Sequence, residues 1–309
     1  MGAEITRESI ELAAHQIEPY VRRTPILDLG GALDRRYRLV LKLDCMQPTG
    51  SFKVRGAFSA LTRAAVPDVG VVAASGGNFG LAVAFAAGVL GQRATVFVPS
   101  TSPAEKIGGI EHLGAEGRVI PGYYTNALEE SRRWAAGSGA FEVHAFDQPD
   151  VVAGQGTCGL EILEQLPEVT TILVSVGGGG LIGGIASWAR DTVTIVGVES
   201  ERCPTMWTAL NAGEPVYVEV GGVAASALGA SRLGEHAWNA REWIDRSCLV
   251  SDDAILESQR WLWDTCRVLA EPAGCAPIAA LATGAYVPEP GETVVALISG
   301  ANTGGVSPE

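Results

Sequence analysis

The chain has 309 residues, of which 47% are hydrophobic and 18% charged, so it can bury a substantial core and is not a disordered chain. Its formal net charge of -13 argues against a nucleic-acid partner, because contact with a phosphate backbone requires clustered Lys and Arg. The N-terminal residues lack the basic start and apolar run of a signal peptide, and no run of about 18 apolar residues predicts a membrane span.

The six cysteines and four histidines are scattered along the chain without the spacing of a metal site. In a chain of this length, such cysteines are expected to be reduced and mostly buried. We therefore expect a cytoplasmic protein without a histidine-based metal site.

Short apolar segments alternate with helical segments along the chain, and glycines cluster where the apolar segments end. This alternation is typical of parallel sheets joined by right-handed helical crossovers. The sequence therefore predicts an α/β fold with two open, mostly parallel twisted sheets flanked by helices. Strands are expected at 71–74, 95–99, 118–120, 142–146, 172–176, 194–199 and 294–298, with helices at 79–91, 125–136 and 181–190.

The segments between 70 and 147 are expected to form a smaller, mobile domain. It is inserted in a larger domain that comprises residues 1–69 and 148–309. Open α/β sheets bind ligands beyond the carboxyl ends of their strands, so the turns at these ends are the candidate sites.

Lys53 follows Gly50, Ser51 and Phe52 in an otherwise uncharged segment. If burial lowers its pKa, a lysine between small residues and an aromatic ring can form a Schiff base. A solvated surface lysine is the alternative interpretation.

The turn SGGN at 75–78 joins an expected strand to an expected helix. Backbone N–H groups at a helix N-terminus bind anions, and Ser75 and Asn78 add side-chain donors, so a substrate carboxylate is a natural ligand. An ordinary strand-to-helix turn remains the alternative.

Four successive glycines, Gly177, Gly178, Gly179 and Gly180, follow an expected buried strand and precede a helix. Their exposed N–H groups predict a phosphate site. The spacing differs from a dinucleotide fingerprint, but Glu199 follows the next strand, so a nicotinamide-binding oxidoreductase stays open as an alternative.

Ser299 follows the last expected strand, where its hydroxyl can donate a hydrogen bond to a heterocycle or accept one. A strand-end turn without a function is the alternative interpretation.

Together these segments resemble the fold-type II pyridoxal-phosphate enzymes, which share the fold of tryptophan synthase β. Within them the chain is most similar to the serine/threonine dehydratase and serine racemase branch, and the similarity spans residues 24–302. The motifs that carry it are GSFKVRGA at 50–57, SGGN at 75–78, AGQGT at 153–157, GGGG at 177–180, EPAG at 271–274 and SGAN at 299–302.

The resemblance implies pyridoxal 5'-phosphate as cofactor and a role for each matching residue. Lys53 would bond the cofactor aldehyde and act as the catalytic base. The remaining cofactor-binding residues would be Phe52 on the ring face, Asn78 at the ring hydroxyl, Gly177, Gly178, Gly179 and Gly180 at the phosphate, and Ser299 at the pyridine nitrogen. The substrate carboxylate would be bound by Ser75, Gly76, Gly77 and Asn78.

The implied activity is that of an ammonia-lyase, which deaminates a β-hydroxy amino acid such as L-serine or L-threonine to a 2-oxo acid and ammonia. A homodimer is expected by the same resemblance. Racemisation, β-replacement or another elimination on the same cofactor remains an alternative, as does a non-catalytic amino-acid-binding protein.

Two segments depart from the pattern of the branch. Gly76 stands where the racemases carry a serine that works on the face opposite the lysine, so two-base racemisation is not expected. The stretch 222–235 lacks the aspartate with which many members bind a divalent cation, so no metal site is expected.

Overall fold

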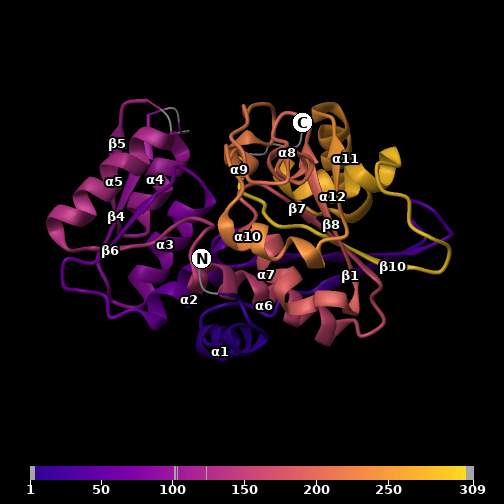
Figure 1. The fold of residues 1–309 in the computed structure, drawn as a ribbon, viewed down its shortest axis with the longest axis horizontal. Coiled ribbons are helices and arrows are strands. Elements are labelled where there is room, and N and C mark those ends of the chain that lie inside the picture. The colour runs from indigo at the N-terminus through magenta and orange to yellow at the C-terminus, as the bar shows by residue number, and fades with distance from the viewer. Residues whose placement is uncertain (1–3, 101, 103, 123, 304–309) are drawn as a thin grey trace.

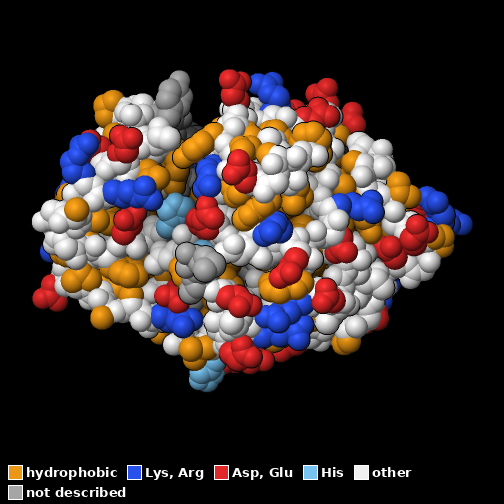
Figure 2. Space-filling model, in the orientation of Figure 1, with side chains coloured by type: hydrophobic (Ala, Val, Ile, Leu, Met, Phe, Trp, Pro, Cys, Tyr) orange, Lys and Arg blue, Asp and Glu red, His pale blue; other side chains and the backbone are white. Residues whose placement is uncertain are grey.

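Two separate β-sheets organise the chain, and Figure 1 shows them side by side, with the smaller one at the left. The computed structural model describes residues 4–303 except 101, 103 and 123. Within these residues no helix is long and apolar enough to cross a bilayer. Acidic and basic side chains are interspersed over the face drawn in Figure 2.

The larger sheet has six strands in the order β1-β2-β10-β7-β8-β9. Only β1 runs antiparallel to its neighbour; the other pairs are parallel. Val295 pairs with both Val40 and Ile172, so β10 occupies the middle of the sheet, and all five of its residues are buried. The strands are β1 Ile26–Gly30, β2 Arg38–Lys42, β7 Thr171–Ser175, β8 Thr194–Ser200, β9 Arg246–Val250 and β10 Thr293–Leu297.

Helices cover both faces of this sheet, and two apolar clusters lie between them and the strands. Continuous apolar strands such as β7 and β10 fit this position, because both of their faces are buried. The helices outside the smaller sheet are α1 Arg7–Ile17, α2 Lys53–Arg63, α6 Pro149–Gln165, α7 Gly180–Ala189, α8 Thr205–Ala212, α9 Ala225–Leu228, α10 Glu235–Asn239, α11 Asp252–Cys266 and α12 Pro272–Thr283.

The smaller sheet has four parallel strands in the order β5-β4-β3-β6. Its central strands are fully buried, with apolar clusters on both faces. Its elements are β3 Val71–Ala74, α3 Asn78–Val89, β4 Ala94–Pro99, α4 Ala104–His112, β5 Glu116–Ile120, α5 Tyr124–Ser138 and β6 Phe141–Glu142. The predicted class of two mostly parallel sheets is confirmed.

The strand predicted at 142–146 is wrong in its extent, because β6 ends at Glu142. After Glu142 the chain turns, and hydrogen bonds between backbone N–H groups and side chains hold this turn. The ring nitrogen Nδ1 of His144 accepts hydrogen bonds from the backbone N–H groups of Phe146 and Asp147, and Gln148 accepts one from the N–H of His144. These bonds satisfy the backbone groups that a longer strand would have paired with a neighbour.

Helix α6 lies between α2 and α7 and touches both closely. A Cβ atom on Gly154 would lie 2.6 Å from the carbonyl oxygen of Arg55 in α2, and one on Gly156 would lie 2.9 Å from that of Gly184 in α7. The AGQGT motif therefore allows two helices to approach α6 to backbone contact. It fixes α2, which begins with Lys53, relative to α7, which begins with Gly180.

Candidate active site

The carboxyl ends of three strands present the predicted site residues. The glycine turn follows β7, Ser299 follows β10 in the same sheet, and Ser75 follows β3 in the smaller sheet. β7 and β10 are neighbours and parallel, so their two turns lie side by side at one edge. Parallel sheets bring such turns together, although they are far apart in the sequence.

Lys53 begins α2, and its ammonium group has only one hydrogen-bond acceptor among the described residues. Nζ donates to the carbonyl oxygen of Ala145 at 3.0 Å and lies 5.0 Å from the ring centre of Phe52 and 5.8 Å from that of Phe79. Burial lowers the pKa of Lys53 to about 8, against the opposing charge of Glu271. Near neutral pH a useful fraction of this amine is therefore unprotonated and nucleophilic.

The glycine turn forms a cradle that is packed so closely that a residue with a side chain would not fit at Gly178 or Gly180. A Cβ on Gly178 would collide with the ring of Phe146, and one on Gly180 would lie 2.5 Å from the carbonyl oxygen of Phe146. Gly179 has φ +88, which favours glycine. Among the described residues, no acceptor takes the N–H groups of Gly177, Gly178 or Gly179, so these donors at the start of α7 suit an anion.

The turn after β10 is tied to the lysine segment. The N–H of Phe52 donates to the carbonyl oxygen of Ser299 at 3.0 Å, and Ser51 forms a bridge with Gly300. Ser299 is 4% exposed. The structure therefore brings the predicted Phe52, Lys53 and Ser299 together.

Asn78 is buried at the start of α3, and its side chain links the two sheets. Its Nδ2 donates to Oε1 of Glu271 at 2.6 Å, and its Oδ1 accepts from Asn302, which also donates to the carbonyl of Thr49. Asn78 is thus bonded directly to Asn302 in the turn after β10 and, through Asn302, connected to the segment that precedes Lys53.

Sequence reasoning gave Glu271 no role, although the EPAG motif begins with it. Burial raises the pKa of Glu271 to about 7, while Lys106, the hydrogen bond from Asn78 and Lys53 act in the opposite direction. Its second oxygen, Oε2, has no hydrogen-bond partner among the described residues. A carboxyl group with a near-neutral pKa and a free oxygen, close to Lys53, is a signal of a functional site.

The turn of residues 75–78, called the carboxylate turn here for its predicted ligand, makes two contacts that the sequence did not indicate. The N–H of Gly77 donates to the hydroxyl of Ser75 at 3.2 Å, as in a turn without ligand. A Cβ on Gly76 would collide with the hydroxyl oxygen of Ser102, which precedes α4. The space beside Gly76 is therefore filled by another hydroxyl, contrary to the expectation of a bare surface at this point.

The geometry of Glu199 argues against a ribose site. Its carboxylate accepts hydrogen bonds from the N–H groups of Met206 and Trp207 at 2.7 Å each and from the hydroxyl of Ser247. These bonds cap the start of α8 with an acceptor that is fully buried. Both oxygens of Glu199 are therefore already bonded to groups of the fold itself.

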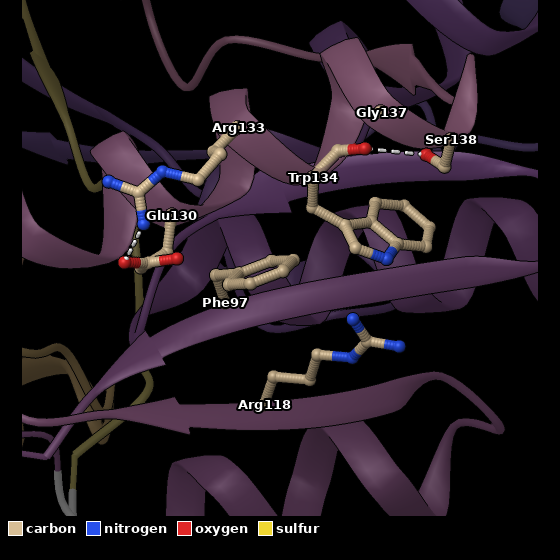
Figure 3. Close-up of a pocket in the computed structure, with 7 residues that line it drawn as sticks. All are labelled: Phe97, Arg118, Glu130, Arg133, Trp134, Gly137 and Ser138. Carbon is tan, nitrogen blue, oxygen red and sulfur yellow. Dashed lines mark hydrogen bonds and ion pairs between the residues drawn. The ribbon is translucent and has the colours of Figure 1, made fainter.

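A separate hollow of about 460 Å³ lies on the smaller sheet, between β4, β5 and α5 (Figure 3). Its arginines are already occupied, because Arg118 pairs with Glu116 at 2.8 Å and Arg133 pairs with Glu130. The remaining lining is Phe97, Trp134, Gly137 and Ser138. None of the predicted site residues borders this hollow.

Comparison with known proteins gives a consistent result. The family model described as "Pyridoxal-phosphate dependent enzyme" matches residues 17–300. An L-threonine ammonia-lyase from Geobacter sulfurreducens is 36% identical, over 94% of this chain and 74% of that protein. A threonine deaminase from T.th. superposes with a TM-score of 0.90 at 36% identity, covering 98% of this chain and 100% of the other. Maize serine racemase has a TM-score of 0.90 at 30% identity, covering 98% and 94%.

These matches confirm the resemblance, the fold and the cofactor that the motifs predicted, and they make the oxidoreductase alternative wrong. The described residues also fit pyridoxal phosphate. The amine of Lys53 can be neutral, the N–H groups of the glycine turn have no other acceptor, and a hydroxyl stands at Ser299.

We expect Lys53→Ala to abolish turnover and the visible absorbance of bound cofactor, because Lys53 is the amine that the motif and its lowered pKa assign to the aldehyde. Borohydride reduction of the holoenzyme followed by peptide mapping should place the label on Lys53. A label on Lys42 or Lys106 would contradict the assignment.

We expect Gly178→Asp to weaken binding of pyridoxal phosphate by at least ~100-fold, because it puts a side chain into the cradle and a negative charge beside an anion. Dissociation constants of the apoenzyme are measured by fluorescence titration. Gly178→Ala, which introduces the same clash with Phe146 but no charge, separates the two causes. Normal binding by Gly178→Asp would show that the phosphate binds elsewhere.

The low pKa of Lys53 predicts how cofactor uptake depends on pH. An amine must be neutral to attack an aldehyde, so the rate of uptake by apoenzyme should rise with pH, with a midpoint near 8 instead of the 10.5 of an ordinary lysine. Stopped-flow absorbance measures this rate. Glu271→Gln removes a charge that raises the pKa of Lys53, so its midpoint should move lower; an upward shift would refute this account.

Proposed function

Since the chain belongs to the family of pyridoxal-phosphate-dependent enzymes, we propose that it is a lyase that releases ammonia from a β-hydroxy amino acid of the L-threonine or L-serine type. The observation that carries this proposal is the partly neutral amine of Lys53, which shares one site with an anion cradle and a carboxylate-binding turn. The names of the relatives support the reaction class and the substrate.

We propose the following roles for the cofactor-binding residues. Lys53 carries the cofactor, Phe52 packs on the ring and Asn78 binds the ring hydroxyl. The amides of the glycine turn, Gly177, Gly178, Gly179 and Gly180, bind the phosphate. Ser299 binds the ring nitrogen, and a neutral hydroxyl there protonates the ring less fully than a carboxylic acid would.

For the substrate, we propose that Ser75, Gly76, Gly77 and Asn78 bind the α-carboxylate. The N-terminus of α3 and the hydroxyl of Ser75 supply donors for it. When a carboxylate enters, the N–H of Gly77 exchanges its bond to Ser75 for a bond to the ligand.

Pyridoxal phosphate supplies an electron-withdrawing ring that acidifies the Cα–H bond of a bound amino acid. Lys53, released by the substrate amine, takes the Cα proton at Nζ. This step requires the unprotonated amine, which its lowered pKa provides near neutral pH. Loss of the β-hydroxyl as water and later hydrolysis give the 2-oxo acid and ammonia.

Several properties of the whole molecule complete the proposal. We propose a division into a mobile domain of residues 70–147 and a larger one of 1–69 and 148–309, with α2 in contact with both, since it packs on α3 and on α6. A homodimer in the cytoplasm is proposed from the resemblance and from six free cysteines.

Racemisation is a second candidate, favoured by one observation. The hydroxyl of Ser102 stands where a side chain on residue 76 would lie, so the face opposite Lys53 is not bare. Among the described residues no base contacts this hydroxyl, and an unaided hydroxyl is a weak acid. Elimination, which needs only the lysine face, is therefore expected to dominate.

We expect the purified holoenzyme to release 2-oxobutanoate from L-threonine and pyruvate from L-serine, each with one equivalent of ammonia. D-serine, followed by chiral chromatography, should form at least ~100-fold more slowly than pyruvate. A correctly positioned acid group typically accelerates proton transfer by at least this factor, and among the described residues none is positioned on the face opposite Lys53. Lys53→Ala serves as the inactive control.

In the same assay, Ser102→Ala should remove any residual D-serine and keep pyruvate release. Absence of 2-oxo acid from every β-hydroxy amino acid in a panel would overturn the lyase proposal. D-serine formation at a rate comparable to pyruvate would establish the racemase alternative.

A further inference from the structure

Lys106 is a buried lysine with no described function. The chain has three lysines: Lys42 pairs with Glu161, Lys53 bonds the carbonyl of Ala145, and Lys106 has neither a hydrogen bond nor an ion pair with any described residue. It is nevertheless only 9% exposed. A lysine that is largely buried and has no anion within 4.0 Å among the described residues can take an anionic ligand as its partner.

Helix α4 directs Lys106 toward the carboxylate turn. Residues four apart lie on the same side of a helix, so Lys106 and Ile110 share one side of α4, and Ser102 precedes the helix. The hydroxyl of Ser102 fills the space beside Gly76, and a Cβ on Gly80 would lie 3.0 Å from Cδ1 of Ile110. Ser102 and Ile110, which come before and after Lys106 in the chain, therefore both pack against the segment 76–80.

Lys106 also acts on Glu271, on the other side of the turn. Its charge lowers the pKa of Glu271 more than Lys53 or the hydrogen bond from Asn78 does. The two groups do not form an ion pair, since none within 4.0 Å connects them among the described residues. A ligand that carries both an acceptor and a donor could therefore contact the ammonium group of Lys106 and the unpartnered oxygen of Glu271.

On the basis of the proposed function, we propose that Lys106 binds the α-carboxylate of the substrate and provides the full positive charge that the neutral donors of residues 75–78 lack. The substrate amine becomes bonded to the cofactor, so the carboxylate is the one charge that a monocarboxylic amino acid brings to this turn. One unpaired cation matches it. A dicarboxylic amino acid would bring a second negative charge beside Glu271 with no further cation, so monocarboxylic substrates are favoured.

The test compares L-alanine, which has no β-hydroxyl to eliminate, with L-alaninamide, which has no carboxylate. Their dissociation constants for the holoenzyme are measured by calorimetry. Lys106→Met should weaken binding of L-alanine by ~10 to ~100-fold, as expected for loss of one charge-assisted hydrogen bond, and leave L-alaninamide unchanged. Lys106→Arg should keep most of the preference for L-alanine.

Arg132→Met is the matched control, because it removes one positive charge from the exposed surface of α5, where Arg132 pairs with Glu142. It should change neither dissociation constant. Equal weakening of both ligands by Lys106→Met, or no weakening of L-alanine, would overturn the proposal. Tight binding of L-aspartate by the wild type, lost in Lys106→Met, would assign Lys106 to a side-chain carboxylate instead.

Thermal unfolding without amino acid excludes a merely structural role. Removing an unpaired buried charge should leave the melting temperature of Lys106→Met equal to or above that of the wild type, and a clear decrease would refute the proposal. The binding readout does not require turnover. If L-alanine binding depends on Lys106 but no 2-oxo acid forms from any substrate, the lyase proposal fails and the carboxylate site stands.

Discussion

Four buried charges hold the helix that carries Lys53. Arg55, two residues after it, donates to both oxygens of Asp44 and to Glu161 in α6, and Glu161 also pairs with Lys42 of β2. Burial alone would raise the pKa of Asp44, but the charges of Arg55 and Lys42 and the hydrogen bonds hold it below its usual value. Two cations and two anions balance, and removing one partner of such a cluster costs about 3–5 kcal/mol.

This cluster gives the site its geometry because it connects a central strand to two helices. β2 supplies Lys42, α2 supplies Arg55 and α6 supplies Glu161. α6 in turn touches α7 through Gly156 and Gly184, and α7 begins at the glycine turn. The amine of Lys53 and the anion cradle are thus positioned by one rigid unit, whereas the carboxylate turn belongs to the other sheet. A substrate that contacts both would therefore be sensitive to how the two sheets close on each other.

The sequence predicted the fold where glycines interrupt apolar strands, because parallel strands buried on both faces leave such a pattern. It also led to the glycine turn and Ser299, which follow strands, and to Lys53 at the start of α2, because each lies in a contiguous motif. The sequence did not reveal contacts between residues that lie far apart along the chain. Ser102, which lies beside Gly76, precedes α4, and Lys106, whose charge acts on Glu271, belongs to that helix, whose charges look like those of any surface helix. The strand at 142–146 was overextended because the side chains of His144 and Gln148 replace the ladder bonds.

The buried charges of the scaffold are paired with one another, whereas three polar atoms of the site have no partner among the described residues. In the scaffold, Arg55, Asp44, Glu161 and Lys42 satisfy one another. At the site, Oε2 of Glu271 and the hydroxyls of Thr49 and Ser51 are buried and have no partner among the described residues. Buried groups of this kind destabilise the fold by themselves.

The unpartnered hydroxyls and the N–H groups of the glycine turn are donors that suit the acceptor oxygens of a ligand. Ligand binding therefore supplies hydrogen bonds that the folded chain alone cannot make, and any ligand that binds only the native state raises its stability. The site is also shielded from water. This desolvation lowers the pKa of Lys53 to about 8 and raises the pKa of Glu271 to about 7. A rigid, internally paired scaffold can carry such a site because its own charges require nothing from the ligand.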